Sequence, residues 1–240
     1  MPSPCVHPMR YNGFDMKRVP ALLACLLVSL ASAATTLADD YRIMPIGDSI
    51  TEGGRTFANY RYPLLKKLTA AGYGVTFVGS RKSDSPAGPL AHEGYGGKTA
   101  EYLATVVGKA LADHPADIVL IHAGHNHFAD QKPVAKIVAA NEAIIQAARK
   151  ANPKVIVLLA QVIPSGKLPK YSYIPELNEK LADLAKRLDK PEQPVVLVDQ
   201  ATAFDPAQHT IPDKVHPNER GAEKMAVKWF ETLATVLRKN

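Results

Sequence analysis

Five short apolar runs, each followed by a loop or a segment with helical periodicity, constrain the fold of this 240-residue chain more than any other feature. The runs are apolar almost throughout, which is typical of strands buried on both faces of a parallel sheet. Connections that contain a helix also favour parallel strands, because a tight turn cannot join them. The expected strands are residues 42–46, 75–78, 118–121, 155–159 and 195–198.

Apolar residues recur at helical spacing after the strands, in residues 64–71, 103–111, 134–148, 177–188 and 222–236. With right-handed crossovers, this alternation predicts a doubly wound α/β fold. We expect a three-layer α/β/α sandwich, flavodoxin-like, with a five-stranded parallel sheet in the order 2-1-3-4-5. The segment 83–93, rich in Gly, Pro and Ser, is expected to be a loop within this domain. Ligands of such folds bind at the carboxyl ends of the strands.

Composition excludes several classes of protein. Hydrophobic residues make up 46% of the chain and charged residues 22%, as in an ordinary globular domain. The net charge is +6, but the 29 basic and 23 acidic residues are interspersed, so no nucleic-acid groove is expected.

The N-terminal segment has the pattern of a secretory signal peptide. Lys17 and Arg18 precede a short apolar run, and small residues offer cleavage after Ala33 or after Ala38. We therefore expect a signal peptide over 1–38 and one domain over 39–240, secreted or periplasmic, with no stable membrane association after cleavage. An uncleaved membrane anchor is the alternative.

Both cysteines, Cys5 and Cys25, lie in the segment expected to be removed. The mature domain would then contain no disulfide, no cysteine nucleophile and no thiolate metal site. Lipidation of Cys25 is a further alternative, but the apolar run continues past that residue.

A nucleophile and its base are expected at two distant points of the chain. Ser49 follows the first strand, and Gly47 is expected to let the backbone turn sharply there. His216 can remove the serine proton, and Asp213, three residues earlier on a loop with Pro217, can orient the ring. The pattern predicts a Ser-His-Asp triad for acyl transfer.

Donors for a developing oxyanion are expected on two further loops. Gly97 precedes a helix after the second strand, and Asn126 follows the third strand. The backbone N–H groups of Ser49 and Gly97 and the side-chain amide of Asn126 would form the oxyanion hole.

This order of residues resembles the SGNH (GDSL-type) hydrolase superfamily over about residues 42–237. The resemblance implies that the four residues that define the superfamily are Ser49, Gly97, Asn126 and His216.

Within the superfamily, the chain is most similar to carbohydrate esterase family 3, the acetylxylan esterases. The similarity lies in RIMPIGDSITEG at 42–53, in YRYPL at 60–64, and in VGS at 78–80 followed by HEG at 92–94. It implies metal-independent removal of acetyl or other short acyl groups from carbohydrate, without a cofactor.

One segment departs from the family pattern. The third block is usually Gly-x-Asn-Asp, whereas residues 124–127 read Gly-His-Asn-His. A neutral His127 ring can accept a hydrogen bond, so we expect it to brace the loop while unprotonated and to tolerate replacement by Asp.

Three histidines near the end of the third strand offer a competing interpretation, a zinc site made by His122, His125 and His127. The nearest acid in sequence is Asp130, and residues two and three apart need not converge. We expect His122 to pack beside the sheet and the other two to line or rim the cleft, and we assign no metal.

Four other polar side chains near the expected site allow local explanations. Asp48 is expected to hydrogen-bond the backbone beside it. Tyr60, Arg61 and Tyr62 either contact a sugar or cover the end of the first long helix.

The sequence therefore predicts a secreted serine esterase acting on acylated carbohydrate or another small ester. One alternative is a broader esterase, lysophospholipase or thioesterase of the same fold. Another is a catalytically weak carbohydrate-binding relative. The sugar, the acyl group and the oligomeric state are left open.

Overall fold

The computed structural model describes residues 1–4 and 40–238. The chain divides into Met1–Thr36 and Leu37–Asn240, and the described helices and strands all lie in the second unit. Apart from residues 1–4, the predicted signal peptide lies outside the described residues. None of the described helices combines the length and hydropathy needed to cross a bilayer.

The predicted parallel strands and their order are confirmed, but the sheet has seven strands, not the predicted five. The five predicted strands are β1 (Tyr41–Gly47), β2 (Val75–Phe77), β5 (Ile118–His122), β6 (Ile156–Ala160) and β7 (Val195–Val198). β1 is central and pairs in parallel with β2 on one side and with β5 on the other. β6 and β7 extend the sheet beyond β5, so the order β2-β1-β5-β6-β7 is the predicted 2-1-3-4-5.

The expectation that residues 83–93 form a loop is wrong for Ser83 and for residues 90–93, which belong to two strands. β4 (Leu90–Gly94) pairs in parallel with the last residues of β1, and β3 (Arg81–Ser83) pairs antiparallel with β4. Polar bonds hold these strands: Glu93 accepts from the Ser80 N–H at 2.9 Å, and His92 Nε2 lies 2.8 Å from the Ser83 hydroxyl. An apolar pattern could not reveal strands with a buried glutamate and histidine.

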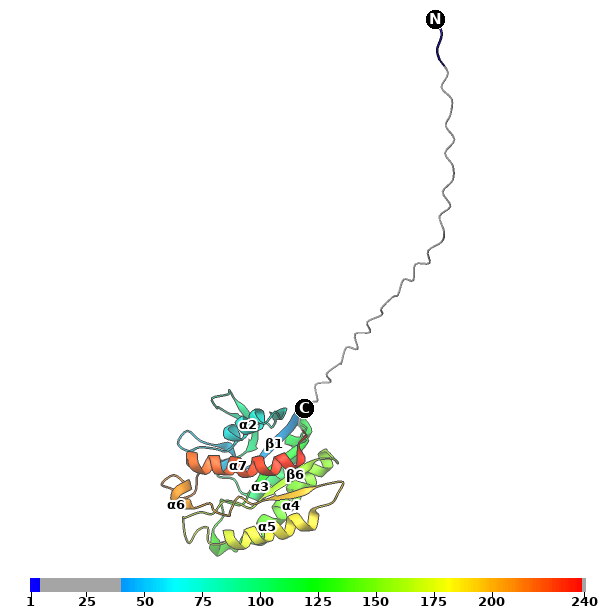
Figure 1. The fold of residues 1–240 in the computed structure, drawn as a ribbon. Helices are drawn as coiled ribbons and strands as arrows, with labels where there is room; N and C mark the ends of the chain where they lie inside the picture. The colour runs from blue at the N-terminus through cyan, green and yellow to red at the C-terminus, as the bar shows by residue number, and fades with distance from the viewer. Residues whose placement is uncertain (5–39, 239–240) are drawn as a thin grey trace. The chain divides into compact units, whose positions relative to one another are not determined.

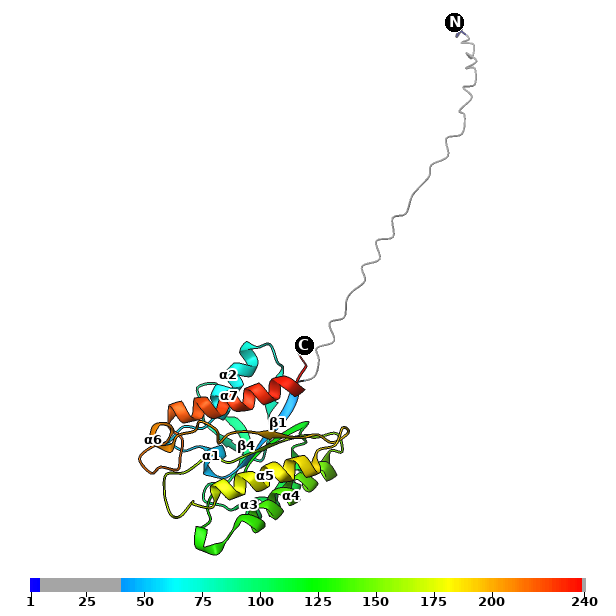
Figure 2. The same ribbon diagram turned by 60° about the horizontal axis from the view of Figure 1, so that its bottom comes forward.

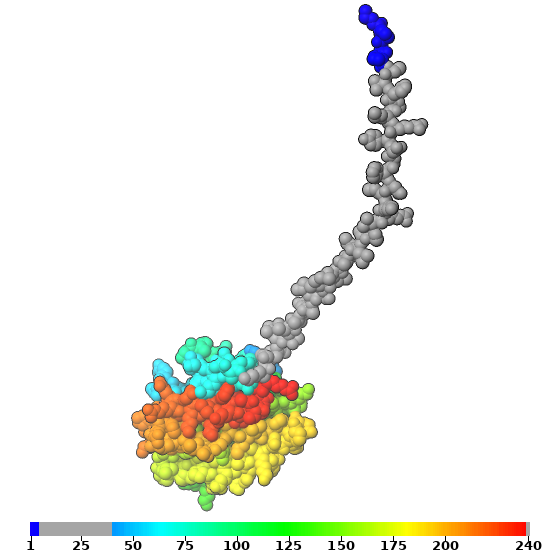
Figure 3. Space-filling view, viewed as in Figure 1, coloured from blue at the N-terminus to red at the C-terminus, as the bar shows by residue number. Residues whose placement is uncertain are grey.

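Helices cover both faces of the sheet, as predicted (Figures 1 and 2). The five long helices are α2 (Arg61–Ala70), α3 (Ala100–Asp113), α4 (Val134–Ala151), α5 (Ile174–Leu188) and α7 (Glu219–Val236). α2 and α7 pack side by side on one face, where Figure 3 shows them in cyan and red. α3, α4 and α5 pack in sequence on the other face.

Alternate residues of the strands build two separate apolar cores. Met44 and Ile46 of β1 lie in the core under α3, α4 and α5, whereas Ile43 lies in the core that contains Trp229 of α7. All four side chains are fully buried. Burial of one such side chain contributes about 1.5–3 kcal/mol, so core packing stabilises the domain.

Three short helical segments were not predicted, because none is long enough to show a helical period. They are α1 (Ser49–Glu52), a 3₁₀ turn (Ala129–Gln131) and α6 (Pro206–His209). Each lies on a loop after a strand, and α1 begins directly at the predicted nucleophile.

The chain passes from β1 into α1 within two residues at Gly47, and a glycine is needed there because a side chain has no space. Its φ lies outside the left-handed region, but a Cβ here would lie 2.5 Å from the His122 carbonyl oxygen and would also collide with Thr51. The missing side chain lets β1 end tightly between β5 and α1.

A buried guanidinium fixes the position of α1. Arg61 is 1% exposed, and it donates to the carbonyl oxygens of Thr51, Glu52 and Leu90 at 2.8, 2.8 and 2.9 Å. Burial lowers the pKa of Arg61 to about 10, which leaves the side chain charged at neutral pH. One side chain thus joins the end of α1 to the start of β4.

Replacing Arg61 by Met should lower the free energy of unfolding by about 3 kcal/mol or more, because the carbonyl groups of Thr51 and Leu90 would lose the Arg61 donor and that of Glu52 would keep only Ser83 Oγ, at 2.8 Å. Urea denaturation measures the effect. Arg61→Lys keeps the charge but not the forked geometry. Its free energy of unfolding should therefore lie between those of the unaltered protein and Arg61→Met. A loss below about 1 kcal/mol in Arg61→Met would contradict this role.

Candidate active site

The structure brings the five predicted site residues to one end of the sheet. Ser49 follows β1, Gly97 follows β4 and Asn126 follows β5, each past the carboxyl end of its strand. Asp213 and His216 lie on the loop between α6 and α7. Figure 2 shows α1 and α6 at this same end of the domain.

Ser49 is the first residue of α1, and its hydroxyl meets the imidazole of His216. Ser49 Oγ lies 2.8 Å from His216 Nε2. Asp48 caps the helix, as predicted, by accepting from the Ile50 N–H at 3.0 Å. This geometry lets Nε2 accept the serine proton, as a nucleophile and its base require.

Asp213 holds the imidazole from the other side. Its Oδ2 lies 2.5 Å from His216 Nδ1, and its Oδ1 accepts from the backbone N–H groups of Val215 and His216 at 2.9 and 3.0 Å. A carboxylate on Nδ1 places the ring proton there and leaves Nε2 free to act as the base.

Burial raises the pKa of Asp213, but the hydrogen bonds from the His216 ring and from the His216 and Val215 backbones outweigh it and bring the pKa below its ordinary value. Asp213 is therefore ionised at neutral pH and opposes the positive charge that forms on His216.

Phe57 stacks on the His216 ring, a contact that sequence reasoning missed. The ring centroids are 4.2 Å apart and the planes 26° apart. The segment that carries Phe57 is tied to the histidine loop, because the Ala58 N–H donates to the Pro217 carbonyl at 3.2 Å. The segment of Phe57 and Ala58 is thus a distant partner that helps to hold the His216 loop in place.

The Gly97 loop lies against the nucleophile. A Cβ on Gly96 would lie 3.8 Å from the Ser49 Cβ, and the Gly96 N–H donates to Glu52 of α1 at 2.6 Å. Gly97 has φ 71° and open space where a Cβ would be. A glycine is favoured here because it adopts this backbone without strain.

Asn126 reaches from the β5 loop to the Gly97 loop. Its Nδ2 donates to the Lys98 carbonyl at 2.9 Å, and its backbone is left-handed, with φ 71°. An amide carries two N–H donors. This bond uses one of them and fixes the group, and the other is the donor that an oxyanion would need.

The expectation that His127 braces its loop as an unprotonated acceptor is wrong. His127 Nε2 lies 2.9 and 3.1 Å from the carboxylate oxygens of Glu101, and Nδ1 lies 3.2 Å from the His125 carbonyl oxygen. Both neighbours are acceptors, so the ring acts as a donor. An Asp at this position would face Glu101 with a like charge.

His125 and His127 are also buried, at 2% and 6% exposure, so the expectation that they line or rim the cleft is wrong. His122 packs beside the sheet as expected and is fully buried. Ring contacts cover His125 on two sides: His122 stacks on it, and Tyr171 meets it edge-on at 5.4 Å.

Asp48, His122 and His125 form the one candidate metal-ligand group among the described residues, with one ligand atom from each lying within 4.8 Å of the others. Asp48 Oδ2, His122 Nδ1 and both nitrogens of His125 are buried and lack a hydrogen-bond partner. The zinc site considered as a competing interpretation therefore had the wrong members: Asp48 lies with His122 and His125, whereas His127 bonds to Glu101.

The tautomer of His122 argues against a metal at this cluster. The Ile163 N–H donates to His122 Nε2 at 3.2 Å, so that nitrogen carries a lone pair. In the neutral ring the proton is then on Nδ1, the unpartnered atom. Burial lowers the pKa of His122 to about 4, so the ring is neutral at pH 7. His122 thus presents a donor where a metal needs a lone pair.

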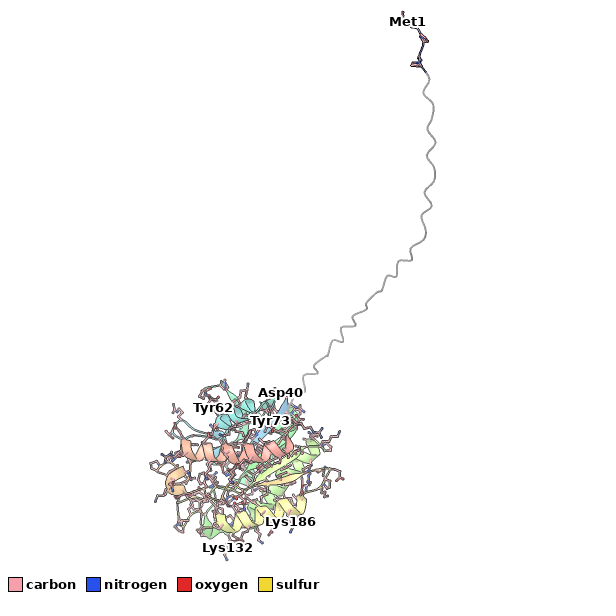
Figure 4. The ribbon with its side chains drawn as sticks, in the orientation of Figure 1. Met1, Asp40, Tyr62, Tyr73, Lys132 and Lys186 are labelled. Atoms are coloured by element: carbon pink, nitrogen blue, oxygen red, sulfur yellow. The ribbon has the colours of Figure 1, made fainter. Side chains whose placement is uncertain are left out.

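Tyr60 and Arg61 are fully buried, which excludes the sugar contact considered for them. Both act inside the fold, where the Tyr60 hydroxyl lies 3.1 Å from Thr51 Oγ1 of α1. Tyr62 lies on α2, where Figure 4 labels it, and the Lys66 ammonium lies 5.8 Å from the centre of its ring.

The GDSL-like lipase/acylhydrolase family model matches residues 46–224, and the chain belongs to this family. Membership of this family assigns the domain that contains residues 46–224 to the carboxylic ester hydrolases.

Three relatives refine the comparison. A carbohydrate esterase family 3 protein from Talaromyces cellulolyticus superposes with a TM-score of 0.73 and 26% identity, over 82% of this chain and 97% of that chain. A family 3 carbohydrate esterase from Clostridium thermocellum gives a TM-score of 0.72 and 26% identity, over 83% of this chain and all of that one. The chain is also 26% identical to a multidomain esterase from Ruminococcus flavefaciens, over 87% of this chain and 30% of that protein's length.

Asp48 should make stability depend on pH. Burial raises its pKa from 3.8 to about 6, so the folded protein bears the strain of a buried charge above pH 6 and not below pH 4. Asp48→Asn keeps the helix cap but removes the charge. The free energy of unfolding of Asp48→Asn, minus that of the unaltered protein, should therefore rise by about 2.5 kcal/mol between pH 4 and pH 8.

Urea denaturation of both proteins at the two pH values measures this difference, and the titration of other groups cancels in the comparison. A difference that does not change with pH would show that Asp48 has an ordinary pKa.

Proposed function

We propose that this chain is a secreted serine esterase that removes acetyl or other short acyl groups from carbohydrate. The observation that carries the proposal is the continuous hydrogen-bonded series from Ser49 Oγ through the His216 ring to Asp213, at 2.8 and 2.5 Å. The likeness to carbohydrate esterases supports the class of substrate, and the predicted signal peptide supports secretion.

The first half of the reaction forms an acyl-enzyme. His216 Nε2 takes the Ser49 proton while Ser49 Oγ bonds to the ester carbonyl carbon. The oxyanion accepts from the N–H groups of Ser49 and Gly97 and from the Asn126 amide. The carbon–oxygen bond to the sugar then breaks, and His216 gives its proton to the departing hydroxyl.

The second half releases the acid. His216 takes a proton from water as the water oxygen bonds to the acyl carbon, and the Ser49 oxygen leaves with the proton returned by His216. Asp213 stays ionised throughout and opposes the charge of the imidazolium.

The exposed surface favours a short acyl group over a long lipid chain. Among the described residues, the large hydrophobic side chains that are well exposed are Met1, Phe128 and Leu168. Within residues 40–238 only Phe128 and Leu168 are such side chains, and a long acyl chain needs a more extended apolar surface.

Ser49 should be the one site of covalent labelling. A fluorophosphonate probe should add once, on the peptide that contains Ser49, and Ser49→Ala should abolish both labelling and ester hydrolysis. Replacement of the exposed Ser172 by Ala should leave both unchanged. His216→Ala should lower kcat by a factor of about 10⁶. Retained hydrolysis in Ser49→Ala would refute the mechanism.

The substrate class can be tested with acetylated xylan, a short aryl acetate and a lysophospholipid, each assayed with EDTA present. We expect kcat/KM to be substantial for the first two and negligible for the third. Comparable turnover of the lysophospholipid would instead identify a broader esterase. Binding of xylan without release of acetate would identify a carbohydrate-binding relative.

A further inference from the structure

The two loops that carry the proposed oxyanion donors come from opposite sides of the central strand. β4, which precedes Gly97, pairs with one edge of β1, and β5, which precedes Asn126, pairs with the other. The sheet fixes where each loop begins. Contacts beyond the strand ends must therefore set the separation of the two donors over Ser49.

An acid–base pair spans these loops. Glu101 is in the first turn of α3, which starts just after Gly97, and its carboxylate oxygens lie 2.9 and 3.1 Å from Nε2 of His127, the neighbour of Asn126. The amide bond from Asn126 to Lys98 crosses the same gap. The Gly97 loop and the Asn126 loop are thus joined at two points.

Acceptors face both ring nitrogens of His127. A carboxylate and a carbonyl group can only accept, and they face Nε2 and Nδ1 respectively. The ring nitrogen that faces Glu101 can therefore donate to the carboxylate, and this bond joins the two loops. The remaining ring contact is the edge of Tyr173, at 6.5 Å, which brings no competing charge.

Glu101 is suited to accept the hydrogen bond from the His127 ring. Burial raises its pKa, but hydrogen bonds from its own backbone N–H and from His127 outweigh this effect and bring the pKa below the ordinary value. Its place in the first turn of α3 also favours a negative charge, because helix N-termini are electropositive. The side chain of His127 is buried, whereas that of Glu101 is partly exposed.

We propose that Glu101 and His127 are positioning residues, a hydrogen-bonded acid–base pair that joins the Asn126 loop to the Gly97 loop and sets the distance between the two oxyanion donors. The proposal rests on the proposed function of those donors. It also accounts for the unusual third block: the loop carries the base, and the acid stands on the neighbouring helix.

The pair acts on the transition state, because its effect passes through donors that bind the oxyanion more strongly than the ground-state carbonyl. Loosening the pair should therefore lower kcat and leave KM nearly unchanged. If the pair merely stabilised the fold, its loss would change the free energy of unfolding but would not lower kcat selectively relative to KM.

The test compares Glu101→Gln, His127→Glu and the double variant Glu101→His/His127→Glu, with a short aryl acetate as substrate. Glu101→Gln removes the charge at a half-exposed helical position and so keeps the fold. His127→Glu places two carboxylates together. The double variant restores the acid–base pair with the two residues exchanged, so that the base is at position 101 and the acid at position 127.

We expect each single variant to lower kcat about tenfold or more, with KM within a factor of about two, and the double variant to recover most of the loss. The matched control is Glu142→Gln, which breaks an ion pair of similar geometry between α4 and α5, where Glu142 and Arg187 meet at 2.7 and 2.9 Å. This control should leave kcat unchanged.

Two results would overturn the proposal. One is a kcat for Glu101→Gln equal to that of Glu142→Gln. The other is a double variant in which the two losses add, with no recovery. Failure of the proposed function is distinguishable from both, because it would appear in the unaltered protein as hydrolysis that does not depend on Ser49.

Discussion

The three hydrogen bonds of the Arg61 guanidinium connect the parts of the site that must not move relative to one another. Ser49 begins α1, and the last carbonyl groups of this single helical turn accept from Arg61. A helix of four residues has almost no stability of its own. The Asp48 side chain caps it at one end and Arg61 binds it at the other, so the nucleophile is held by two buried polar contacts. Because Arg61 also binds Leu90, the same charge aligns the strand that leads to Gly97.

Two carboxylates near His216 have opposite environments. Asp213 is partly exposed and accepts three hydrogen bonds, which lower its pKa, whereas Asp48 is fully buried, which raises its pKa to about 6. The charge of His216 lowers the pKa of Asp48 in part. Proton transfer from Ser49 to His216 would therefore stabilise both carboxylates at once. In the proposed mechanism, the buried Asp48 charge is unfavourable in the resting site. It becomes less unfavourable when the imidazolium forms on His216.

The sequence was sufficient for features that depend on periodicity and chain order. Apolar runs located the five parallel strands, and right-handed crossovers gave their order, so Ser49, Gly97 and Asn126 could be placed at one edge. Asp213 and His216 are close in sequence, and their hydrogen bond needs no long-range information. Side-chain partners from distant segments could not be predicted in this way. The contacts of Phe57 with His216 and of Glu101 with His127 are examples. From sequence alone, Phe57 could equally lie against other loop residues, and Glu101 could equally be a solvent-exposed residue of its helix.

The missed strands and the histidine cluster have one physical cause. Sequence reasoning places polar residues outside, but around this site they are inside: Glu93, His92 and His122 are all at most 1% exposed. Burial keeps His92 and His122 neutral, with pKa values of about 3 and 4. Neutral imidazoles can fill the space behind the catalytic loops and bond to backbone groups without adding charge near an oxyanion. His127 differs because Glu101 faces it: among the buried histidines of residues 40–238, it is the one whose two nitrogens both face acceptors. The partner that holds this loop is therefore a side chain on α3 and not a residue of the loop itself.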